Sequence, residues 1–181
     1  MAGIVKFLGD THAEHKKIFT PRGFSTLEDH DLAICRSIAD NMNSRDCLVL
    51  TGDICFGSPD KFFFLIKKCL EERYGWRMDK INFDIKVVQG NHDKTSMLQY
   101  CKDQGYINSF SSLLEYKHEG KKYVVTHVPI HPCSMERWDY NIHGHTHAFK
   151  LDDERYINTS WEQYLAPMSI AQIQHLRSLR V

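Results

Sequence analysis

Near the start of the chain, a short β-prone run ends in a glycine, a carboxylate and an imidazole: Ile4-Val5-Lys6-Phe7-Leu8-Gly9-Asp10-Thr11-His12. The same order, an apolar run followed at once by polar donors, recurs along the chain. The recurring donor segments are Gly52-Asp53, Gly90-Asn91-His92-Asp93, Thr126-His127 and Gly144-His145-Thr146-His147. Because neighbouring strands of a sheet end at a common edge, we expect these side chains to meet there.

Metal chemistry gives a reason for donors dispersed in this way. Two adjacent divalent cations need about eight protein donors, which no single helix or loop can supply. Imidazole and carboxylate without thiolate suit Mn, Fe, Zn, Co or Ni better than Mg or Ca. We expect two divalent ions, with Mn first because it tolerates six-coordinate sites rich in oxygen. A glycine beside the donors lets the backbone turn sharply and approach an ion closely.

In this order the segments resemble the signature of the calcineurin-like metallophosphoesterases: Asp-x-His, Gly-Asp, Gly-Asn-His-Asp/Glu, a single His, then Gly-His-x-His. The match runs from Asp10 to His147 and fills every position. The stretch 10–24 resembles a small bacterial and phage branch of that family, with Ala13-Glu14 in place of Phe-Gly and Gly23 in place of proline. The implied fold is α/β, with two packed mixed β-sheets flanked by helices in a four-layer α-β-β-α sandwich.

The resemblance also implies how the donors divide between two ions. One ion would be held by Asp10, His12, Asp53 and His147, and the other by Asp53, Asn91, His127 and His145. Asp53 is the expected bridge, since a carboxylate has two oxygens and can neutralise two cations. Asn91 supplies a neutral oxygen that limits the negative charge of the site. A mononuclear site is the alternative, and it would leave half of these donors without a role.

The implied chemistry is hydrolysis of a phosphoester by a hydroxide that bridges the two ions, which lower the pKa of water toward about 7. His92 matches the catalytic histidine of the family and would protonate the leaving group. Asp93 would orient His92 or raise its pKa, and the alternative is that it caps the helix near Thr95. Arg22 is a candidate phosphate clamp, because its planar fork binds phosphate oxygens, and an ordinary surface arginine is the alternative. His15 is a candidate substrate contact.

We therefore predict an enzyme, a metal-dependent phosphodiesterase acting on a small or nucleotide-type phosphoester. A phosphomonoesterase of the same fold is the first alternative, and a nuclease or a non-catalytic protein-binding scaffold are further ones. Degenerate ligands would mark a scaffold, and none is degenerate. The motifs enclose no insertion long enough for a cap domain. We expect an open site whose selectivity comes from the loops 13–24 and 129–139, where Phe24 and Trp138 could stack on a base or simply pack.

Length and composition bound the other expectations. The 181 residues predict a single domain over 1–181. Lys and Arg number 23, as do Asp and Glu, and this balance disfavours a grip on extended nucleic acid. The six cysteines lack a Cys-x-x-Cys pair and predict reduced core thiols. With no signal peptide, lipidation motif or long apolar span, the sequence predicts a cytoplasmic protein without membrane contact, and it leaves the oligomeric state open.

Local patterns predict the scaffold between the motifs. Helices are expected after the capping-box spacing at Ser25-Thr26-Leu27-Glu28, from Ser58-Pro59-Asp60 to about Gly75, near Met97 to Gln104, and after Ser169. Strands are expected at 4–8, 47–50, 81–88, 140–142 and 155–158, with a hairpin between 113–116 and 123–126. The alternation of strands and helices up to Val88 predicts parallel strands joined by right-handed crossovers.

Overall fold

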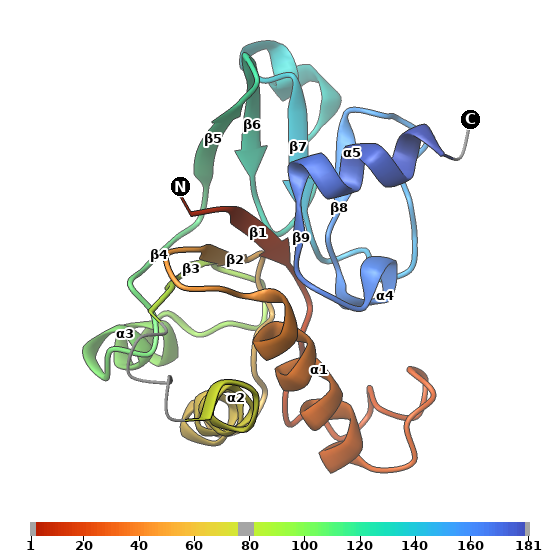
Figure 1. Ribbon diagram of the computed structural model, residues 1–181. Helices are drawn as coiled ribbons and strands as arrows, with labels where there is room; N and C mark the ends of the chain where they lie inside the picture. Colours follow the sequence, from red (N-terminus) through yellow and green to blue (C-terminus); the bar gives the residue numbers. More distant parts are fainter. Residues whose placement is uncertain (1–2, 76–81, 180–181) are drawn as a thin grey trace.

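Two mixed β-sheets pack against each other in the computed structural model, which describes residues 3–75 and 82–179 (Figure 1). The first sheet has the strand order β4-β3-β2-β1-β9 and the second has the order β5-β6-β7-β8. The strands are β1 (Val5–Leu8), β2 (Cys47–Leu50), β3 (Asp84–Val88), β4 (Ser109–Ser111), β5 (Leu114–His118), β6 (Lys121–Val125), β7 (Tyr140–His143), β8 (Tyr156–Asn158) and β9 (Met168–Ser169). The predicted fold class, two mixed sheets flanked by helices, is confirmed.

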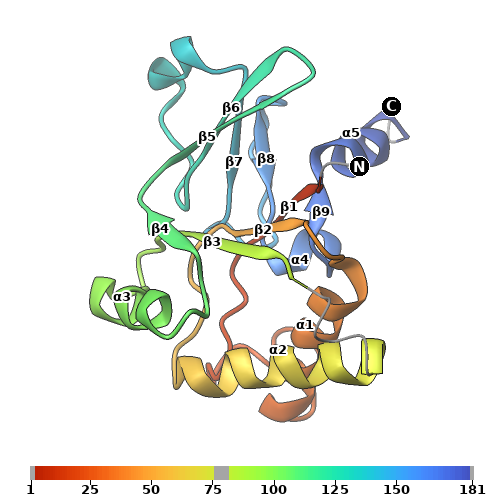
Figure 2. The same ribbon diagram turned by 60° about the vertical axis from the view of Figure 1, so that its left-hand side comes forward.

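The first sheet is built by the predicted succession of strands and helices. β1 pairs in parallel with β2, and β2 with β3, with Phe7 opposite Val49 and Val49 opposite Lys86. The helices α1 (Leu27–Asn41), α2 (Pro59–Tyr74) and α3 (Thr95–Asp103) lie on one side of this sheet (Figures 1 and 2). Side chains such as Ile34 and Phe62 bury the helical stripes against Leu48 and Leu50. The parallel opening is therefore confirmed.

A second core lies between the two sheets. Along β1, Leu8 faces the helices while Phe7 faces the second sheet, as the period of two along a strand requires. Phe7 packs there with Tyr123 and Ile142. The helix α5 (Ile170–Ser178) closes this core with Ile170 and Ile173, and its start has the capping box between Ser169 and Gln172. On the outer face of the second sheet, the 3-10 helix η2 (Pro132–Arg137) covers Val124 and Tyr156.

Several details depart from the sequence-based expectations. Thr26, not Ser25, caps α1 and accepts the Asp29 N–H. The hairpin between β5 and β6 turns on Glu119 and Gly120, both at positive φ (48° and 76°), as a two-residue hairpin turn requires. Strand β3 begins at Asp84, and the expected start at residue 81 lies outside the described residues. The elements β4, η2, the helix α4 (Trp161–Tyr164) and β9 were not predicted, because each is too short to show a periodic pattern.

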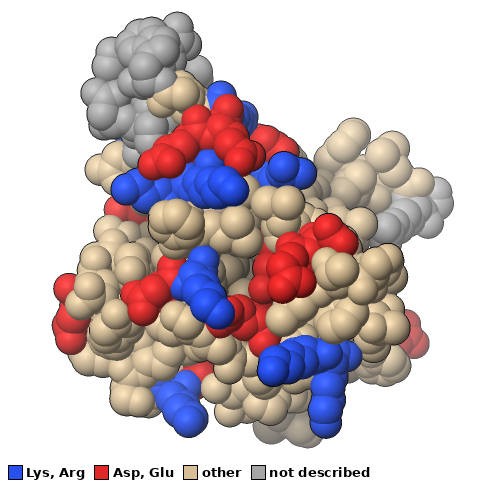
Figure 3. All heavy atoms as spheres, turned by 90° about the horizontal axis from the view of Figure 1, so that it is seen from below, with Lys and Arg blue, Asp and Glu red and all other residues tan. Residues whose placement is uncertain are grey.

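The thiols and surface charges agree in part with the composition. All six cysteines are free, and four of them are buried as predicted, whereas Cys133 is exposed. On the lower side of the molecule, where α1 and α2 lie, acidic and basic side chains are interspersed (Figure 3). The pairs Arg36–Glu72 and Lys67–Glu71, at 3.9 Å each, belong to these helices. Among the described helices, none has the length and apolar character that crossing a membrane would require.

Candidate metal centre

The predicted metal ligands come together where strands of both sheets end. Asp10 and His12 follow β1, Asp53 follows β2, and Asn91 follows β3 in the first sheet. His127 follows β6 and the pair His145 and His147 follows β7 in the second sheet. The Asp10 N–H donates to the carbonyl of Gly52 (3.0 Å), and the Gly144 N–H donates to the carbonyl of His127 (3.0 Å), so the ends within each sheet are fastened to each other.

One group of donors gathers around the carboxylate of Asp10. Asp10 Oδ1 lies 3.6 Å from His12 Nε2 and 3.8 Å from His147 Nε2. His12 Nε2 also lies 3.7 Å from Asp53 Oδ2. Ligand atoms of Asp10, His12 and His147 all lie within 4.8 Å of one another, a spacing that one metal ion can span. These are the side chains that the resemblance assigned to the first ion.

A second group gathers on the other side of Asp53. His127 Nε2 lies 3.4 Å from Asp53 Oδ2 and 2.9 Å from Asn91 Oδ1. His145 Nδ1 lies 2.9 Å from the same Asn91 oxygen. Thus Asp53 stands between the two donor groups, and His145 turns Nδ1, not Nε2, toward the site. The structure brings the predicted ligands of the second ion together, while coordination of an ion by them stays a prediction.

Several of these donors have the properties of metal ligands. Asp10 Oδ1 and both ring nitrogens of His12 are buried and have no hydrogen-bond partner among the described residues. Leaving such polar atoms buried without a partner costs about 1–3 kcal/mol each, so native proteins avoid it away from functional sites. Burial raises the pKa of Asp53, but hydrogen bonds from His127 and the His92 N–H outweigh it and lower the pKa. The residues present therefore fit divalent metal ions bound by oxygen and nitrogen.

Many of the predicted ligands have a backbone conformation that residues other than glycine rarely adopt. The left-handed region holds Asp10 (φ 53°), His12 (φ 48°), Asp53 (φ 53°), His145 (φ 65°) and His147 (φ 49°). Such conformations are uncommon outside glycine, although Asp and His tolerate them better than most residues. Their concentration at one site indicates strain that the surrounding structure imposes in order to aim the side chains inward.

Gly90 shows why glycine accompanies these donors. A Cβ added there would lie 2.2 Å from Asp53 Oδ1 and 2.3 Å from the Asp53 backbone nitrogen, closer than real contacts allow. Only glycine lets the end of β3 approach the Asp53 carboxylate this closely. The close approach also lets the His92 N–H donate to Asp53 Oδ1 at 2.9 Å.

The role that we expected for Asp93 is wrong. Its buried carboxylate accepts the backbone N–H groups of Asp53 (2.8 Å), Ile54 (3.0 Å) and Gly90 (2.9 Å). Both oxygens are thus directed at the ends of β2 and β3, away from a contact that would orient His92. The cap position of α3 is Lys94, so Asp93 does not cap that helix either. Burial raises the pKa of Asp93 despite the hydrogen bonds that oppose the change. Asp93 fastens the backbone that carries Asp53.

His92 is exposed at the mouth of the donor cluster, and its ring is held by aromatic packing. The ring lies 4.9 Å from that of Phe56 and 6.3 Å from that of His12, centroid to centroid. Phe56 also stacks on His12 at 4.9 Å and meets His15 edge-on at 4.1 Å. The pKa of His15 is lowered, mainly by its burial and then by the charge of His12. Sequence reasoning missed Phe56, since an aromatic residue after a strand carries no motif.

The side chain of Arg22, the predicted phosphate clamp, points into the protein and not toward a substrate. Its side chain is only 3% exposed, and its donors are used inside the protein. Nε and Nη2 contact Glu162 Oε1 at 2.9 and 2.8 Å, while Nη2 donates to the carbonyl of Asp10 (2.7 Å) and Nη1 to that of Thr11 (3.2 Å). A guanidinium committed in this way has no free edge for a substrate phosphate. Arg22 is a structural residue of the site.

Glu162 is the second residue that the sequence did not reveal. Glu162 lies in α4, and its Oε1 accepts a hydrogen bond from His147 Nδ1 at 2.8 Å in addition to its contacts with Arg22. Burial raises the pKa of Glu162, but the His147 hydrogen bond and the charge of Arg22 outweigh it and lower the pKa to about 2. His127 is held similarly, because its Nδ1 contacts the Thr51 carbonyl at 2.8 Å. Each contact leaves Nε2 of the histidine directed into the donor cluster.

The replacement of Phe-Gly by Ala13-Glu14 also has a structural consequence. Ala13 donates its N–H to Ile54 and accepts the Phe56 N–H (3.0 and 2.8 Å), which joins the loops after β1 and β2. Glu14 accepts the Ser58 N–H at the start of α2 and pairs with Lys61 at 2.9 Å. The beginning of the loop 13–24 is therefore fixed against α2. Its Phe24 is half-buried and meets His30 edge-on at 5.4 Å.

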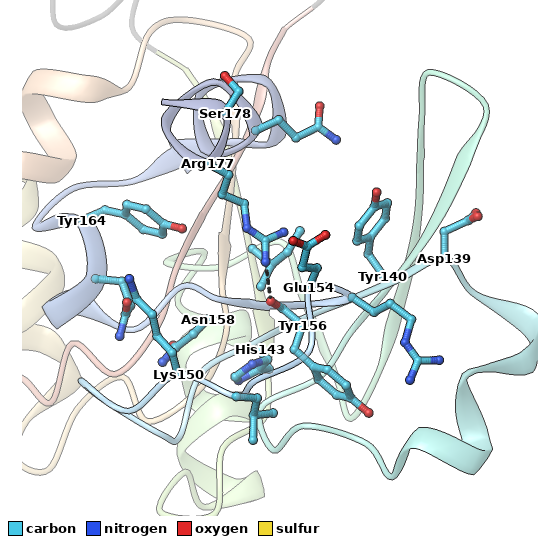
Figure 4. A pocket seen from close by; sticks show the side chains of 15 residues that line it. Asp139, Tyr140, His143, Lys150, Glu154, Tyr156, Asn158, Tyr164, Arg177 and Ser178 are labelled. Atoms are coloured by element: carbon cyan, nitrogen blue, oxygen red, sulfur yellow. Dashed lines mark hydrogen bonds between the residues drawn. The ribbon is translucent and has the colours of Figure 1, made fainter. Parts of the chain in front are cut away.

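Two cavities lie near this centre. One, of about 430 Å³, is lined by Asn91 and His127 together with Gln89, Gly90, Ser112, Thr126 and Val128. The other, of about 660 Å³, lies beside β7, β8 and α5, where Arg177 donates to the carbonyl of Tyr156 at 3.0 Å (Figure 4). The predicted metal ligands do not line this larger cavity. The smaller cavity therefore adjoins the donor cluster, and the larger one is separate from it.

The chain is an α/β protein in which histidines and carboxylates that could hold a metal ion gather at the strand ends of two mixed sheets. No family model matches the chain. An uncharacterized protein of Methanocaldococcus jannaschii is 26% identical over 156 residues, 85% of this chain and 75% of that protein. A protein of unknown function from Aquifex aeolicus has a similar crystal structure, with a TM-score of 0.71 and 21% identity over 96% of this chain and 99% of that one. A solved archaeal phosphodiesterase reaches a TM-score of 0.46 at 21% identity, covering 89% and 86% of the two chains. The Aquifex structure shows that the fold is shared.

Proposed function

We propose that this protein is a metal-dependent phosphohydrolase with two divalent ions, and that phosphodiesters are its first class of substrate. The observation that carries the proposal is that Asp53 Oδ2 lies 3.7 Å from His12 Nε2 and 3.4 Å from His127 Nε2. Asp10 Oδ1 and His12 Nε2 are also buried and have no hydrogen-bond partner among the described residues. The complete series of motifs that resembles the metallophosphoesterases supports the same conclusion. We expect Mn to serve best.

The residues have separable tasks in this proposal. Asp10, His12, Asp53 and His147 would hold one ion, and Asp53, Asn91, His127 and His145 the other. Bound ions supply Lewis acidity for the phosphate oxygens and lower the pKa of water. His92 lies at the exposed edge of the cluster and would deliver a proton to the leaving group. Asp93 and Gly90 would hold Asp53 in place.

The openness of the site favours a diester over a monoester. Asn91, His92 and His145 are exposed, and the cavity of about 430 Å³ extends from Asn91 and His127. A diester carries a substituent on both sides of its phosphate, and such a substrate needs an open site. The cavity is a suitable place for one of the substituents. Monoester hydrolysis is the alternative that the same experiment tests.

A screen of metals against substrates tests this proposal. Metal-free protein is loaded with Mn, Fe, Co, Ni or Zn and assayed with bis(p-nitrophenyl) phosphate and p-nitrophenyl phosphate. We expect chelator-sensitive hydrolysis, strongest for the diester with Mn, and loss of activity in the Asp53→Asn variant. Metal-free protein as active as the loaded form would contradict a metal-dependent reaction. Metal binding without hydrolysis of either ester would instead support a non-catalytic scaffold.

A further inference from the structure

A chain of polar contacts, most of them partly buried, links the predicted ligand His147 to residues far from it in the sequence. His147 Nδ1 contacts Glu162 Oε1 at 2.8 Å, and the same oxygen contacts Arg22 Nε at 2.9 Å. Arg22 Nη1 then lies 2.9 Å from His30 Nε2, and His30 Nδ1 lies 2.7 Å from Asp31 Oδ1. His30 is fully buried. The chain thus joins the loop after β7, α4, the loop after β1, and α1.

The chemistry of the donors fixes the direction of each contact. An arginine has no acceptor, so Nη1 donates to His30 Nε2, and the His30 Nδ1–H must donate to Asp31. At the other end, the ionised Glu162 can only accept, so His147 donates from Nδ1. The other ring nitrogen of His147, Nε2, therefore keeps a lone pair that can bind a metal ion. Nε2 lies 3.8 Å from Asp10 Oδ1. This is the tautomer and orientation that a metal-binding imidazole needs.

Arg22 connects this orientation to the first ligand of the site. Its Nη2 donates to the backbone carbonyl of Asp10 at 2.7 Å and contacts Glu162 Oε1 at 2.8 Å. One guanidinium therefore ties the segment that carries Asp10 to the carboxylate that orients His147. The second donor group is held differently, because His127 rests on a backbone carbonyl and Asn91 contacts both His127 and His145.

We propose that Glu162 and Arg22 are positioning residues that preset Asp10 and His147 for one of the two ions, since their side chains contact these two residues and not Asn91, His127 or His145. The proposal rests on the metal site of the proposed function. Loss of a partner that orients a metal-bound histidine lowers metal affinity by about 10–100-fold. The two donor groups meet at Asp10, whose Oδ2 accepts the His145 N–H at 2.8 Å. Glu162, however, contacts His147 and not Asn91, His127 or His145, so we expect its loss to fall on the position that includes His147.

The test is a titration of metal-free protein with Mn, in which free Mn is counted by electron paramagnetic resonance. We expect two binding events in the wild type, and in Glu162→Gln a drop of about 10–100-fold in the affinity of one event alone. Glu71→Gln is the matched control, since it removes a carboxylate on the exposed face of α2, where its partner is Lys67. It should bind Mn as the wild type does.

Arg22→Lys is the second variant, because it keeps the positive charge and loses the planar fork. We expect it to weaken the same event, since a lysine cannot contact Glu162 and the Asp10 carbonyl with the geometry of the fork. Unchanged affinities in folded Glu162→Gln, or an equal loss at both events, would overturn the inference. A wild type that binds no Mn would instead contradict the proposed function, so the two failures are distinguishable.

Discussion

Replacing Gly90 with alanine tests how closely the fold holds the carboxylate of Asp53. The new Cβ would lie 2.2 Å from Asp53 Oδ1, and real Cβ contacts essentially never fall below 3.0 Å, so the two groups must separate by at least 0.8 Å. This movement stretches the hydrogen bond from the His92 N–H to Asp53 Oδ1 and the one from the Asp53 N–H to Asp93. Overpacking of this kind costs about 1–3 kcal/mol, and a weakened charged hydrogen bond adds about 1.5–3 kcal/mol.

We therefore expect Gly90→Ala to lose about 2.5–6 kcal/mol of unfolding free energy, measured by urea denaturation of metal-free protein. A displacement of about 1 Å near the reacting groups costs on the order of 10²-fold in rate, which the diester assay measures. Gly105→Ala is the control, because Gly105 also has a constrained backbone (φ 73°) but its added Cβ would meet no atom within 4 Å. It should lose stability and keep Mn affinity and rate. Gly90→Ala with the Mn affinity and rate of the wild type would refute this reasoning.

Three further predictions concern proton transfer, packing and pH. His92→Ala should keep both metal ions and lose about 10²–10⁴-fold in rate with poor leaving groups, but much less with nitrophenolate; equal losses would make His92 a phosphate-binding residue. Phe56→Ala removes the ring contact of about 0.5–1.5 kcal/mol that holds His92, so it should also lose more rate with poor leaving groups, roughly 2–10-fold, and Phe56→Tyr should not. The pKa of Asp139 is lowered by the Lys122 N–H and then by Lys121, so its stabilising effect is present above its unfolded pKa of 3.8 and is lost as pH falls through the lower folded pKa. The difference in unfolding free energy between wild type and Asp139→Asn should accordingly vanish in acid, and a difference independent of pH would contradict the assignment.

The strand ends could be predicted from the sequence because each donor segment directly follows an apolar run. Asp10, Asp53 and Asn91 lie two or three positions after the last residue of a strand. Parallel strands bring such positions to one edge of the sheet. The two sheets and the helices on the first one follow from the same local patterns. The sequence patterns thus predict the order of strands and helices and the positions of the donor residues along that order.

The contacts beyond the donors could not be predicted in the same way. Asp93 and Arg22 were assigned to catalysis and substrate. The partners of Asp93 are backbone groups, and those of Arg22 include the Asp10 carbonyl and the Glu162 side chain, which only the folded chain brings within reach. Glu162 lies in a four-residue helix with no periodic pattern, 15 positions from the histidine that it orients. Phe56 gains its place by stacking on His12, a contact set by where the loops after β1 and β2 meet. These roles depend on tertiary geometry, which spacing along the chain does not encode.

The number of Mn ions bound per chain tests the central claim most directly. Elemental analysis of Mn-saturated wild-type protein, after removal of free metal, counts the ions that the two donor groups hold. The geometry around Asp53 predicts two ions per chain, and fewer in Asp53→Asn, because the bridging carboxylate serves both groups. A single fully occupied ion per chain at saturating Mn would contradict the dinuclear centre.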